Sequence, residues 1–436
     1  MSALTLARAQ FALTVMVHYL YPVLTMGLGV VLVIVASLRL RRPDDEVYHR
    51  MLRFWTHIFG VVFAGGVATG VVMEFEFGTN WASYSRFVGD IFGAPLAAEA
   101  LIAFFLESSF LSILLFGEKR VSPRAHWFAT LMVALGATLS AFWIVAANSW
   151  QQTPAGFHIL HGRAELTDFW AAVFNPSTPL RFLHAVLGSW VTAAVFVGSI
   201  SAYYLLHGRH QEFARRSLRL ALLLGLVSIA AEVVVGDAHT RQAARTQPEK
   251  FAAIEVLHHT QTGAPLAVVG QPLPEVLLPK LLSLMTYFDF DAKVTGLDAF
   301  APEDRPPVTA TAMSFHAMLW LGLALGVVLA LGVFLWWRGR LFVSRRYLKV
   351  IFYCLPIPFV VNEIGWVTAE VGRQPWSVYH LLRTEDAFSR SVPAAEVAVS
   401  LFMFVVIYIG LLGLTVHLVR KRVLQGPGGV AEEVPS

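Results

Sequence analysis

The chain has 436 residues, of which 56% are hydrophobic and only 14% are charged, whereas an ordinary soluble domain has about 25% charged residues. This composition excludes an ordinary soluble protein and indicates residence in lipid. The formal net charge of +4 does not indicate nucleic acid binding, because the basic residues lie in short bursts between apolar stretches and not along one polar face. The single cysteine, Cys354, excludes a disulfide framework and a thiolate metal site.

Nine apolar runs are long enough to predict membrane helices, which need about 20 mostly apolar residues each. The sixth run is the shortest, and no small-residue cleavage site follows the first, so we expect no cleavable signal peptide. In chain order the runs cover residues 11–38, 54–75, 97–116, 127–150, 183–206, 220–235, 311–337, 350–371 and 392–419.

The positive charges predict the orientation of these helices, because Lys and Arg accumulate in cytoplasmic loops. Five clusters on one side hold 20 of the 33 basic residues: Arg39, Arg41, Arg42, Arg50, Arg53; Lys119, Arg120, Arg124; Arg209, Arg215, Arg216, Arg219; Arg338, Arg340, Arg345, Arg346, Lys349; and Arg420, Lys421, Arg422. We therefore expect an all-α protein of a prokaryotic cytoplasmic membrane, with the N-terminus outside and the C-terminus cytoplasmic.

The expected organisation has four parts. Residues 1–236 form helices 1 to 6, residues 237–310 form a long polar loop on the outer face, residues 311–422 form helices 7 to 9, and residues 423–436 form a disordered cytoplasmic tail. A loop as long as 237–310 is usually either functional or disordered.

Ionisable side chains within membrane helices are costly, so each is a functional candidate. Together with one possible thioether ligand they are His18, Glu99, Glu107, His184, Met318 and Glu370, all expected in the outer half. A His and a Met at equal depth on different helices suit a six-coordinate haem. A lone membrane His can equally be an interhelical hydrogen-bond partner, and a lone Met is usually packing, so the residues alone leave both interpretations open.

Four segments in the same order resemble signature segments of subunit I of cytochrome bd-type quinol oxidases. They are QFALTVMVHYL from Gln10, MEFEFGTNW from Met73, GDIFGAPLAAEALIAFFLES from Gly89 and GWVTAEVGRQPW from Gly365. The family's nine-helix topology, with the N-terminus outside, agrees with the count of apolar runs.

The resemblance implies three haems. His184 and Met318 match the axial ligands of a low-spin haem b, and His18 and Glu370 match the iron ligands of a high-spin haem b and a haem d, or a third haem b, without an individual assignment. Trp366 matches an aromatic between haems; an interfacial belt Trp is the alternative. Arg373 resembles a partner of haem propionates, and a snorkelling Arg is its alternative.

The resemblance also implies two proton-handling sites. Glu99 and Glu107, about two turns apart and so roughly on one side of their helix, match carboxylates that deliver protons and compensate charge near the oxygen-reducing haems. In the outer loop, Lys250 and Glu255 match residues implicated in quinol oxidation; a solvated ion pair is the alternative. One position departs from the family, since His316 stands where Arg is common, which predicts weaker or pH-dependent propionate pairing.

The function implied is oxidation of quinol at the outer face and reduction of O2 to water, generating a proton motive force without pumping. The implied partners are subunit II, small single-helix subunits and membrane lipid, with no nucleic acid. Two other classes of protein compete with this function. A haem-poor, non-catalytic paralogue is disfavoured by the retained ligand set, and a transporter explains neither the His/Met pair nor GRQPW.

Overall fold

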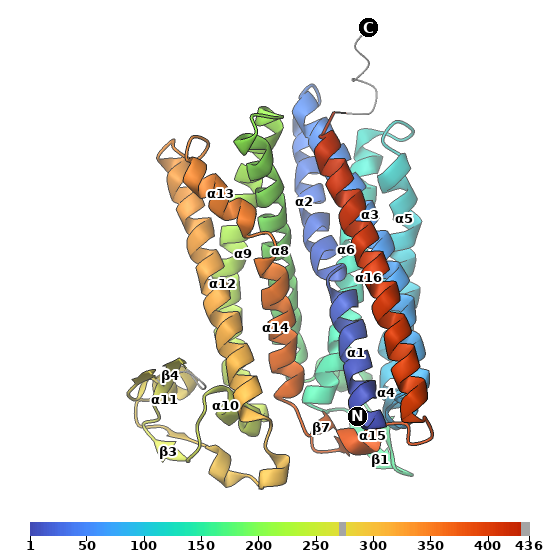
Figure 1. Cartoon of the computed structure of the whole chain (residues 1–436), viewed down its shortest axis with the longest axis vertical. Helices are drawn as coiled ribbons and strands as arrows, with labels where there is room; N and C mark the ends of the chain where they lie inside the picture. The colour runs from blue at the N-terminus through green and yellow to red at the C-terminus, as the bar shows by residue number, and fades with distance from the viewer. Residues whose placement is uncertain (270–275, 429–436) are drawn as a thin grey trace.

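A computed structural model describes residues 1–269 and 276–428 of the chain. Nine helical stretches within these residues are long and apolar enough to span a membrane, which confirms the predicted all-helical membrane fold. They run roughly side by side (Figure 1). The spans consist of α1 (Ala3–Tyr19) with α2 (Pro22–Arg41), α3 (Glu46–Gly78), α4 (Ala82–Ala98) with the π-helix η1 (Glu99–Phe104) and α5 (Phe105–Phe116), α6 (Pro123–Gln152), α8 (Thr178–Leu206), α9 (Gln211–Thr246), α12 (Val308–Trp337), α13 (Arg345–Tyr353) with α14 (Ile357–Val371), and α16 (Ala394–Gln425).

Proline explains the break in the first span. Pro22 has no N–H to donate to the carbonyl of His18, so α1 ends at Tyr19 and α2 begins at Pro22. The N–H of Tyr21 closes a tighter turn onto the His18 carbonyl instead, at 3.1 Å. His18 therefore lies in the last turn of a helix, within a continuous span.

The short elements gather at the end of the bundle that holds the N-terminus, whereas the last helix ends at the opposite end (Figure 1). The short helices are α7 (Phe169–Val173), α10 (Pro248–Ile254), α11 (Leu281–Tyr287), η2 (Leu297–Ala299), η3 (Pro302–Asp304) and α15 (Thr384–Ala387). Four antiparallel strand pairs join them: β1 (Phe157–Leu160) with β2 (Arg163–Leu166), β3 (Gln261–Thr262) with β6 (Lys293–Val294), β4 (Leu266–Val269) with β5 (Val276–Leu278), and β7 (Trp376–Val378) with β8 (Leu382–Arg383).

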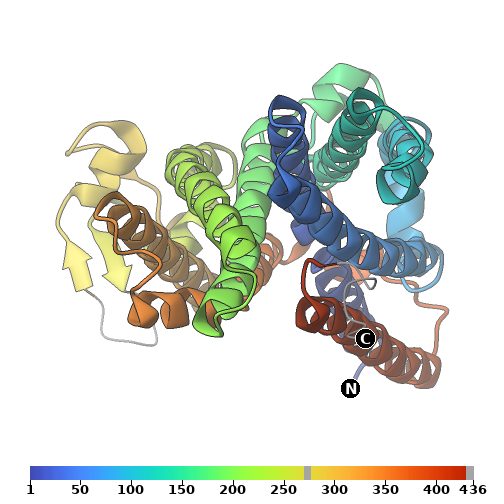
Figure 2. The ribbon, with the colours of Figure 1, turned by 90° about the horizontal axis from the view of Figure 1, so that it is seen from above.

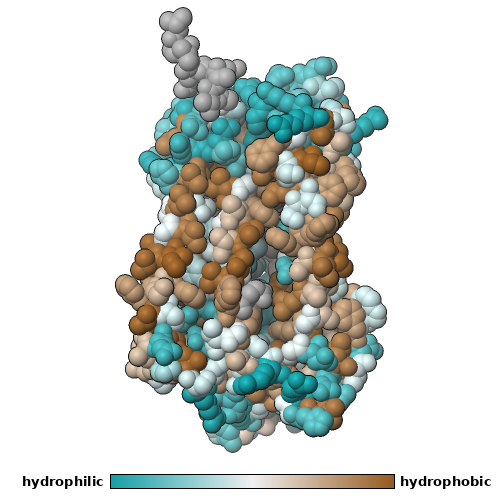
Figure 3. All heavy atoms as spheres, turned by 90° about the vertical axis from the view of Figure 1, so that its right-hand side faces the viewer, coloured by the Kyte–Doolittle hydropathy of each residue, from teal (hydrophilic) through white to brown (hydrophobic). Residues whose placement is uncertain are grey.

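The surface carries the signature of a membrane protein. Hydrophobic residues form a broad band around the middle of the face in Figure 3, and hydrophilic residues cover both ends. Large apolar side chains within the spans are exposed, among them Val327 on α12 and Phe402 on α16. Such exposure is unfavourable in water and is satisfied by lipid tails.

The interior is built on helix α8, which packs against α2, α6, α9 and α14. Viewed from above, α8 and α2 lie between a group formed by α9 and α12 and a group formed by α3, α5 and α6 (Figure 2). The largest buried cluster includes Leu28, Trp55, Phe59, Val197 and Phe213. This packing fixes the helices from which the candidate side chains project.

Two predicted boundaries were wrong. Helix α9 continues to Thr246 and is not the short sixth helix ending before 237, because its last three turns are polar and carry no apolar signal. Helix α16 runs to Gln425, so the predicted tail cannot begin at 423. Residues 429–436 of that tail lie outside the described part of the chain.

Candidate functional site

His18 projects from α1 toward α3. Its Nδ1 lies 2.9 Å from Thr69 Oγ1, and the ring lies against Gly70, where a Cβ atom would come within 3.1 Å of His18 Cε1. The glycine gives the imidazole room that any larger residue would take.

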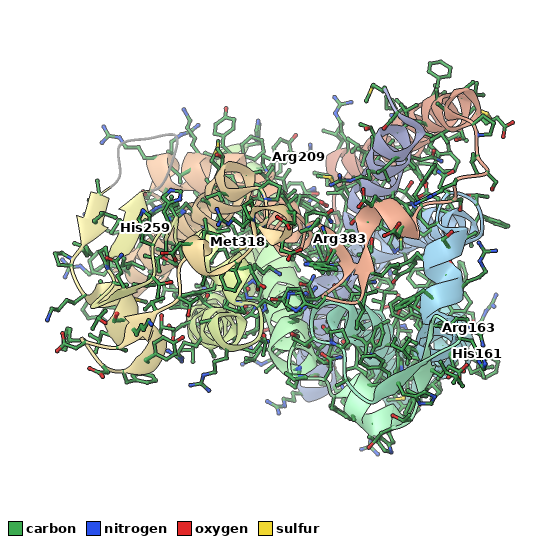
Figure 4. All side chains as sticks on the ribbon, turned by 90° about the horizontal axis from the view of Figure 1, so that it is seen from below. His161, Arg163, Arg209, His259, Met318 and Arg383 are labelled. Carbon is green, nitrogen blue, oxygen red and sulfur yellow. The ribbon has the colours of Figure 1, made fainter. Side chains whose placement is uncertain are left out.

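His184 and Met318 project from neighbouring parts of the bundle. His184 lies in the second turn of α8, and Met318 lies in the third turn of α12, helices that both contact α14. A Cβ on Gly365 of α14 would lie 3.0 Å from Met318 Sδ. Figure 4, which views the molecule from the loop-bearing end, places Met318 beside the strands of the long loop.

Glu370, at the end of α14, lies in a buried polar network. Its carboxylate accepts hydrogen bonds from Arg373, from Asn148 at 3.3 Å and from Gln152 at 3.3 Å. Arg181 of α8 lies 3.9 Å away and also donates to Asn148. Two guanidinium groups around one carboxylate leave a surplus of positive charge in the interior, which an anionic ligand group would compensate.

Arg373 and Trp366 flank this network. The Nε and Nη1 atoms of Arg373 are buried and have no hydrogen-bond partner among the described residues. The Trp366 ring meets Tyr19 edge-on, with centroids 5.4 Å apart, and the Arg181 guanidinium lies 5.8 Å from its centroid. Trp366 thus bridges α1 and α8 inside the bundle.

Glu99 and Glu107 both face α6. Ser140 Oγ donates to Glu99 Oε1 at 2.7 Å, and Glu107 packs on Gly136, where a Cβ would come within 2.9 Å of the Glu107 Cβ. Glu107 is buried. It lies 9 residues before the end of a span that begins at Ala82 and ends at Phe116, so it is nearer the end of the bundle opposite the long loop.

Lys250 and Glu255 are both buried, with 7% and 5% of their surfaces exposed, which rules out the solvated ion pair considered above. Nor do they pair with each other. Lys250 Nζ donates to Gln152 Oε1 at 2.9 Å and to Gln247 Oε1 at 3.3 Å. Glu255 Oε2 has no hydrogen-bond partner in the described structure.

Burial sets the protonation of these two loop residues. Desolvation, and secondly the charge of Arg181, holds the pKa of the Lys250 ammonium well below its usual range. Desolvation alone raises the pKa of the Glu255 carboxyl to about 8. A carboxyl with such a pKa can both accept and release a proton near neutral pH.

His316 contacts the long loop. Its Nδ1 lies 2.9 Å from the Ala312 carbonyl oxygen and its Nε2 lies 2.8 Å from the carbonyl oxygen of Ala267 in β4. Trp320, one turn further on, donates to the carbonyl of Val268 at 3.0 Å. With both ring nitrogens engaged by backbone, His316 tethers β4 to α12.

Sequence reasoning missed three residues of this site: Arg181, Gln152 and Glu232. Gln152 connects the loop to the bundle, because it accepts from Lys250 and donates to Glu370. Glu232 Oε1 lies 2.9 Å from His184 Nδ1. Arg181 and Glu232 are charged residues in or beside predicted spans and carried the same signal as the residues that were selected. A buried Gln carries no such signal.

The residues present fit haem on structural grounds. Two candidate ligands pack against glycines. A Cβ atom on Gly70 would crowd the His18 ring, and a Cβ atom on Gly365 would crowd the Met318 sulfur. The two unpartnered nitrogens of Arg373 suit a propionate carboxylate. His and thioether side chains are recognised axial ligands of haem iron.

Nine spans among the described residues, with His, Met, carboxylate and guanidinium groups between them, define a multi-pass membrane protein whose interior suits a redox cofactor. The family model for cytochrome bd terminal oxidase subunit I matches residues 6–427. The chain belongs to this family: it is a bacterial multi-pass membrane protein, the haem-containing first subunit of a quinol:oxygen oxidoreductase complex.

Several relatives support this membership. The chain is 36% identical to cytochrome bd ubiquinol oxidase subunit 1 of Bacillus subtilis, covering 98% of this chain and 94% of the relative. It is 35% identical to cytochrome bd-II ubiquinol oxidase subunit 1 of Escherichia coli, covering 99% and 98%. The solved structure of the bd oxidase from Geobacillus thermodenitrificans matches with a TM-score of 0.90 and 28% identity, over 97% of this chain and 99% of that chain.

Proposed function

We propose that quinol is oxidised at the loop-bearing end of the bundle, beside Lys250 and Glu255, and that this end faces the outside of the cell. The proposal rests on one observation: a chain of hydrogen bonds connects the loop to the bundle interior. Lys250 of α10 reaches Gln152 of α6, and Gln152 reaches Glu370 of α14. A quinol held beside Lys250 would therefore lie one short polar chain away from a candidate iron ligand.

His184 and Met318 would hold a low-spin haem b, while His18 and Glu370 would hold the iron of a high-spin haem b and of a haem d, or a third haem b. When bound, the haems supply one-electron transfer and the iron at which O2 is reduced. Arg373 orients a propionate through its free Nε and Nη1. For Glu370 to bind iron, one oxygen must leave its present donors, and Arg181 then stays paired through Asn148.

Glu255 accepts a proton from a quinol hydroxyl and releases it outside. Lys250 positions α10 against the bundle: a Cβ on Gly372 of the GRQPW segment would come within 3.0 Å of Lys250 Cε, so this signature segment packs directly on the loop helix. Glu249 of α10 strengthens the same contact, since it accepts from Tyr379 and, at 3.0 Å, from His380.

Glu99 and Glu107 take up protons from the opposite, cytoplasmic side. Their position against α6, with Glu107 nearer the far end, leads from that side toward the interior. Charge is then separated across the membrane because electrons and protons arrive from opposite faces, without pumping.

The orientation rests on the positive charges, which favour a cytoplasmic location for the end opposite the long loop. In this assignment the helices up to Thr246 and the helices from Val308 to Gln425 hold the spans, and the segment between Thr246 and Val308 is the outer, quinol-binding loop. The partners would be subunit II, small single-helix subunits and lipid of the cytoplasmic membrane. The relatives' names include both a ubiquinol and a menaquinol oxidase, so either quinol is a candidate substrate.

The test is Glu255→Gln in the complete oxidase. The variant keeps size and removes the base, so quinol oxidase activity should fall roughly 10²-fold. Haem content should not change, and oxygen reduction with an artificial electron donor that bypasses the quinol site should survive. Equal loss of both activities, or loss of neither, would place quinol oxidation elsewhere.

A further inference from the structure

Three successive turns of α9 lie against one side of the His184 ring. Glu232, Gly236 and His239 follow one another at spacings of four and three residues, which places them on one helix face. His184 Cε1 would lie 3.8 Å from a Cβ on Gly236, and the His239 ring centroid lies 5.8 Å from that of His184. This face of α9 therefore forms the wall behind the His184 ring.

Glu232 supplies the only carboxylate that the structure describes in contact with His184. Its Oε1 lies 2.9 Å from His184 Nδ1, an ion-pair distance without the alignment of a hydrogen bond, and both His184 Nδ1 and Glu232 Oε2 are buried with no hydrogen-bond partner among the described residues. Its side chain is 16% exposed, against 31% for His184. A carboxylate in a membrane span that serves no other described partner is retained at a cost.

We propose that Glu232 is a positioning residue that sets the orientation and the reduction potential of the low-spin haem through His184. This inference rests on the assignment of His184 as an axial ligand. A carboxylate beside Nδ1 favours the tautomer with the proton on that nitrogen, so Nε2 is the atom that would bind iron, and the imidazole would be a stronger electron donor. It also places negative charge near the iron, which stabilises the oxidised state.

Glu232 and Met318 thus have opposite effects on the reduction potential of the low-spin haem. A thioether ligand raises the potential of a haem, whereas Glu232 lowers it through the ligand on the other side. The balance keeps the haem reducible by quinol and still able to pass the electron onward.

The test is a spectroelectrochemical titration of the complete oxidase carrying Glu232→Gln. Glutamine keeps the shape and an oxygen acceptor for Nδ1 but removes the charge. The reduction equilibrium of the low-spin haem should shift at least about tenfold toward the reduced state, which for a one-electron couple corresponds to about 59 mV upward. Glu232→Leu, which removes the acceptor as well, should shift it further and alter the electron paramagnetic resonance signal of the low-spin iron.

The matched control is Glu363→Gln. Glu363 of α14 is another carboxylate in a membrane span, with both oxygens buried and unpartnered in the described structure, so it makes no hydrogen bond to a proposed ligand there. Its substitution should leave the potential within experimental error of the parent. An equal shift in both variants, or no shift with Glu232→Gln, overturns the proposal.

His184→Ala separates this inference from the ligand assignment. If the low-spin haem spectrum persists in His184→Ala, the assignment of the ligand fails, and the inference fails with it. If that spectrum is lost while Glu232→Gln keeps the parental potential, the ligand stands and only the role of Glu232 is wrong. A stably assembled Glu232 variant is confirmed independently by its haem content.

Discussion

At the level of single residues, the position of Met318 depends on a glycine. A Cβ atom on Gly365 would lie only 3.0 Å from Met318 Sδ, so α14 shapes the place of a thioether borne by α12. The contact explains why a Gly precedes Trp366 in the GWVTAEVGRQPW segment. The thioether and the glycine can therefore be tested separately.

The first prediction concerns Met318→Leu. Leucine keeps a similar volume and cannot bind iron, so we expect the low-spin haem to become high-spin while the chain remains inserted and His184 retains the haem. Optical and electron paramagnetic resonance spectra of the purified complex report the change. An unaltered low-spin spectrum would remove Met318 from the site.

The second prediction concerns Gly365→Ala. Alanine is favoured over glycine in a helix by about 1 kcal/mol, so any damage must come from the contact with Met318. We expect a mixture of low-spin and high-spin haem. Gly322→Ala on α12 is the control, because a Cβ there meets nothing within 4 Å; both variants behaving alike would contradict the argument.

The third prediction concerns pH. Burial raises the pKa of the Glu255 carboxyl to about 8, so the proton-accepting form is the minor one at pH 6 and grows about tenfold per unit until the pKa is reached. The kcat/KM for quinol should therefore rise from pH 6 to pH 8 and level off above. In Glu255→Gln this rise should disappear. A flat wild-type profile measured at limiting quinol would exclude Glu255 as the base.

At the level of elements, the helices that could be predicted from the sequence were those marked by long runs of apolar residues. Nine apolar runs gave nine spans among the described residues, since lipid imposes a minimum length that composition reveals. The polar last turns of α9, the break at Pro22 and the paired strands of the loop were not predicted. Their stability comes from contacts made by the folded chain, such as the bond from His316 to Ala267, which no local pattern encodes.

The fourth prediction tests the contact between the third span and α6. Glu107→Gln removes a proton carrier from the wall formed with Gly136 and keeps its shape, so oxygen reduction should slow by roughly 10²-fold while haem content is retained. Glu76→Gln is a matched control, because Glu76 is a buried membrane carboxylate on α3 that accepts from Thr14 of α1 at 2.7 Å. Full turnover in Glu107→Gln with all haems bound would contradict the proton path.

At the level of the whole molecule, the proposed function depends on the separation of the two ends. The long loop with Lys250 and Glu255 lies at the end that holds the N-terminus, and α16 ends at the other (Figure 1). The candidate ligands could be proposed from the sequence because charges and imidazoles stand out in apolar runs and because the signature segments resemble those of the family. Gln152, which joins Lys250 to Glu370, was not selected, because uncharged polar residues in helices usually serve packing.

The fifth prediction tests the orientation. The single native cysteine, Cys354, is 6% exposed, so a cysteine introduced at an exposed site should be the only one labelled. In intact cells a membrane-impermeant maleimide should label Arg163→Cys, in the β1–β2 hairpin (Figure 4), and should not label Arg340→Cys until the cells are opened. The reverse pattern would invert the proposed topology.

Because of the π-helix η1, the number of residues between Glu99 and Glu107 determines whether both carboxylates face α6. In a regular α-helix, residues eight positions apart, such as Glu99 and Glu107, differ in direction by about 80°, whereas the wider turn from Glu99 to Phe104 brings both to face α6. Deleting one residue there would restore a regular helix in which the two carboxylates, then seven positions apart, point within about 20° of one another, whereas a regular helix with the present spacing would turn them about 80° apart. Homologues that keep both carboxylates should therefore show either the present spacing with a π-helix or a spacing one residue shorter without one, even where sequence identity is low.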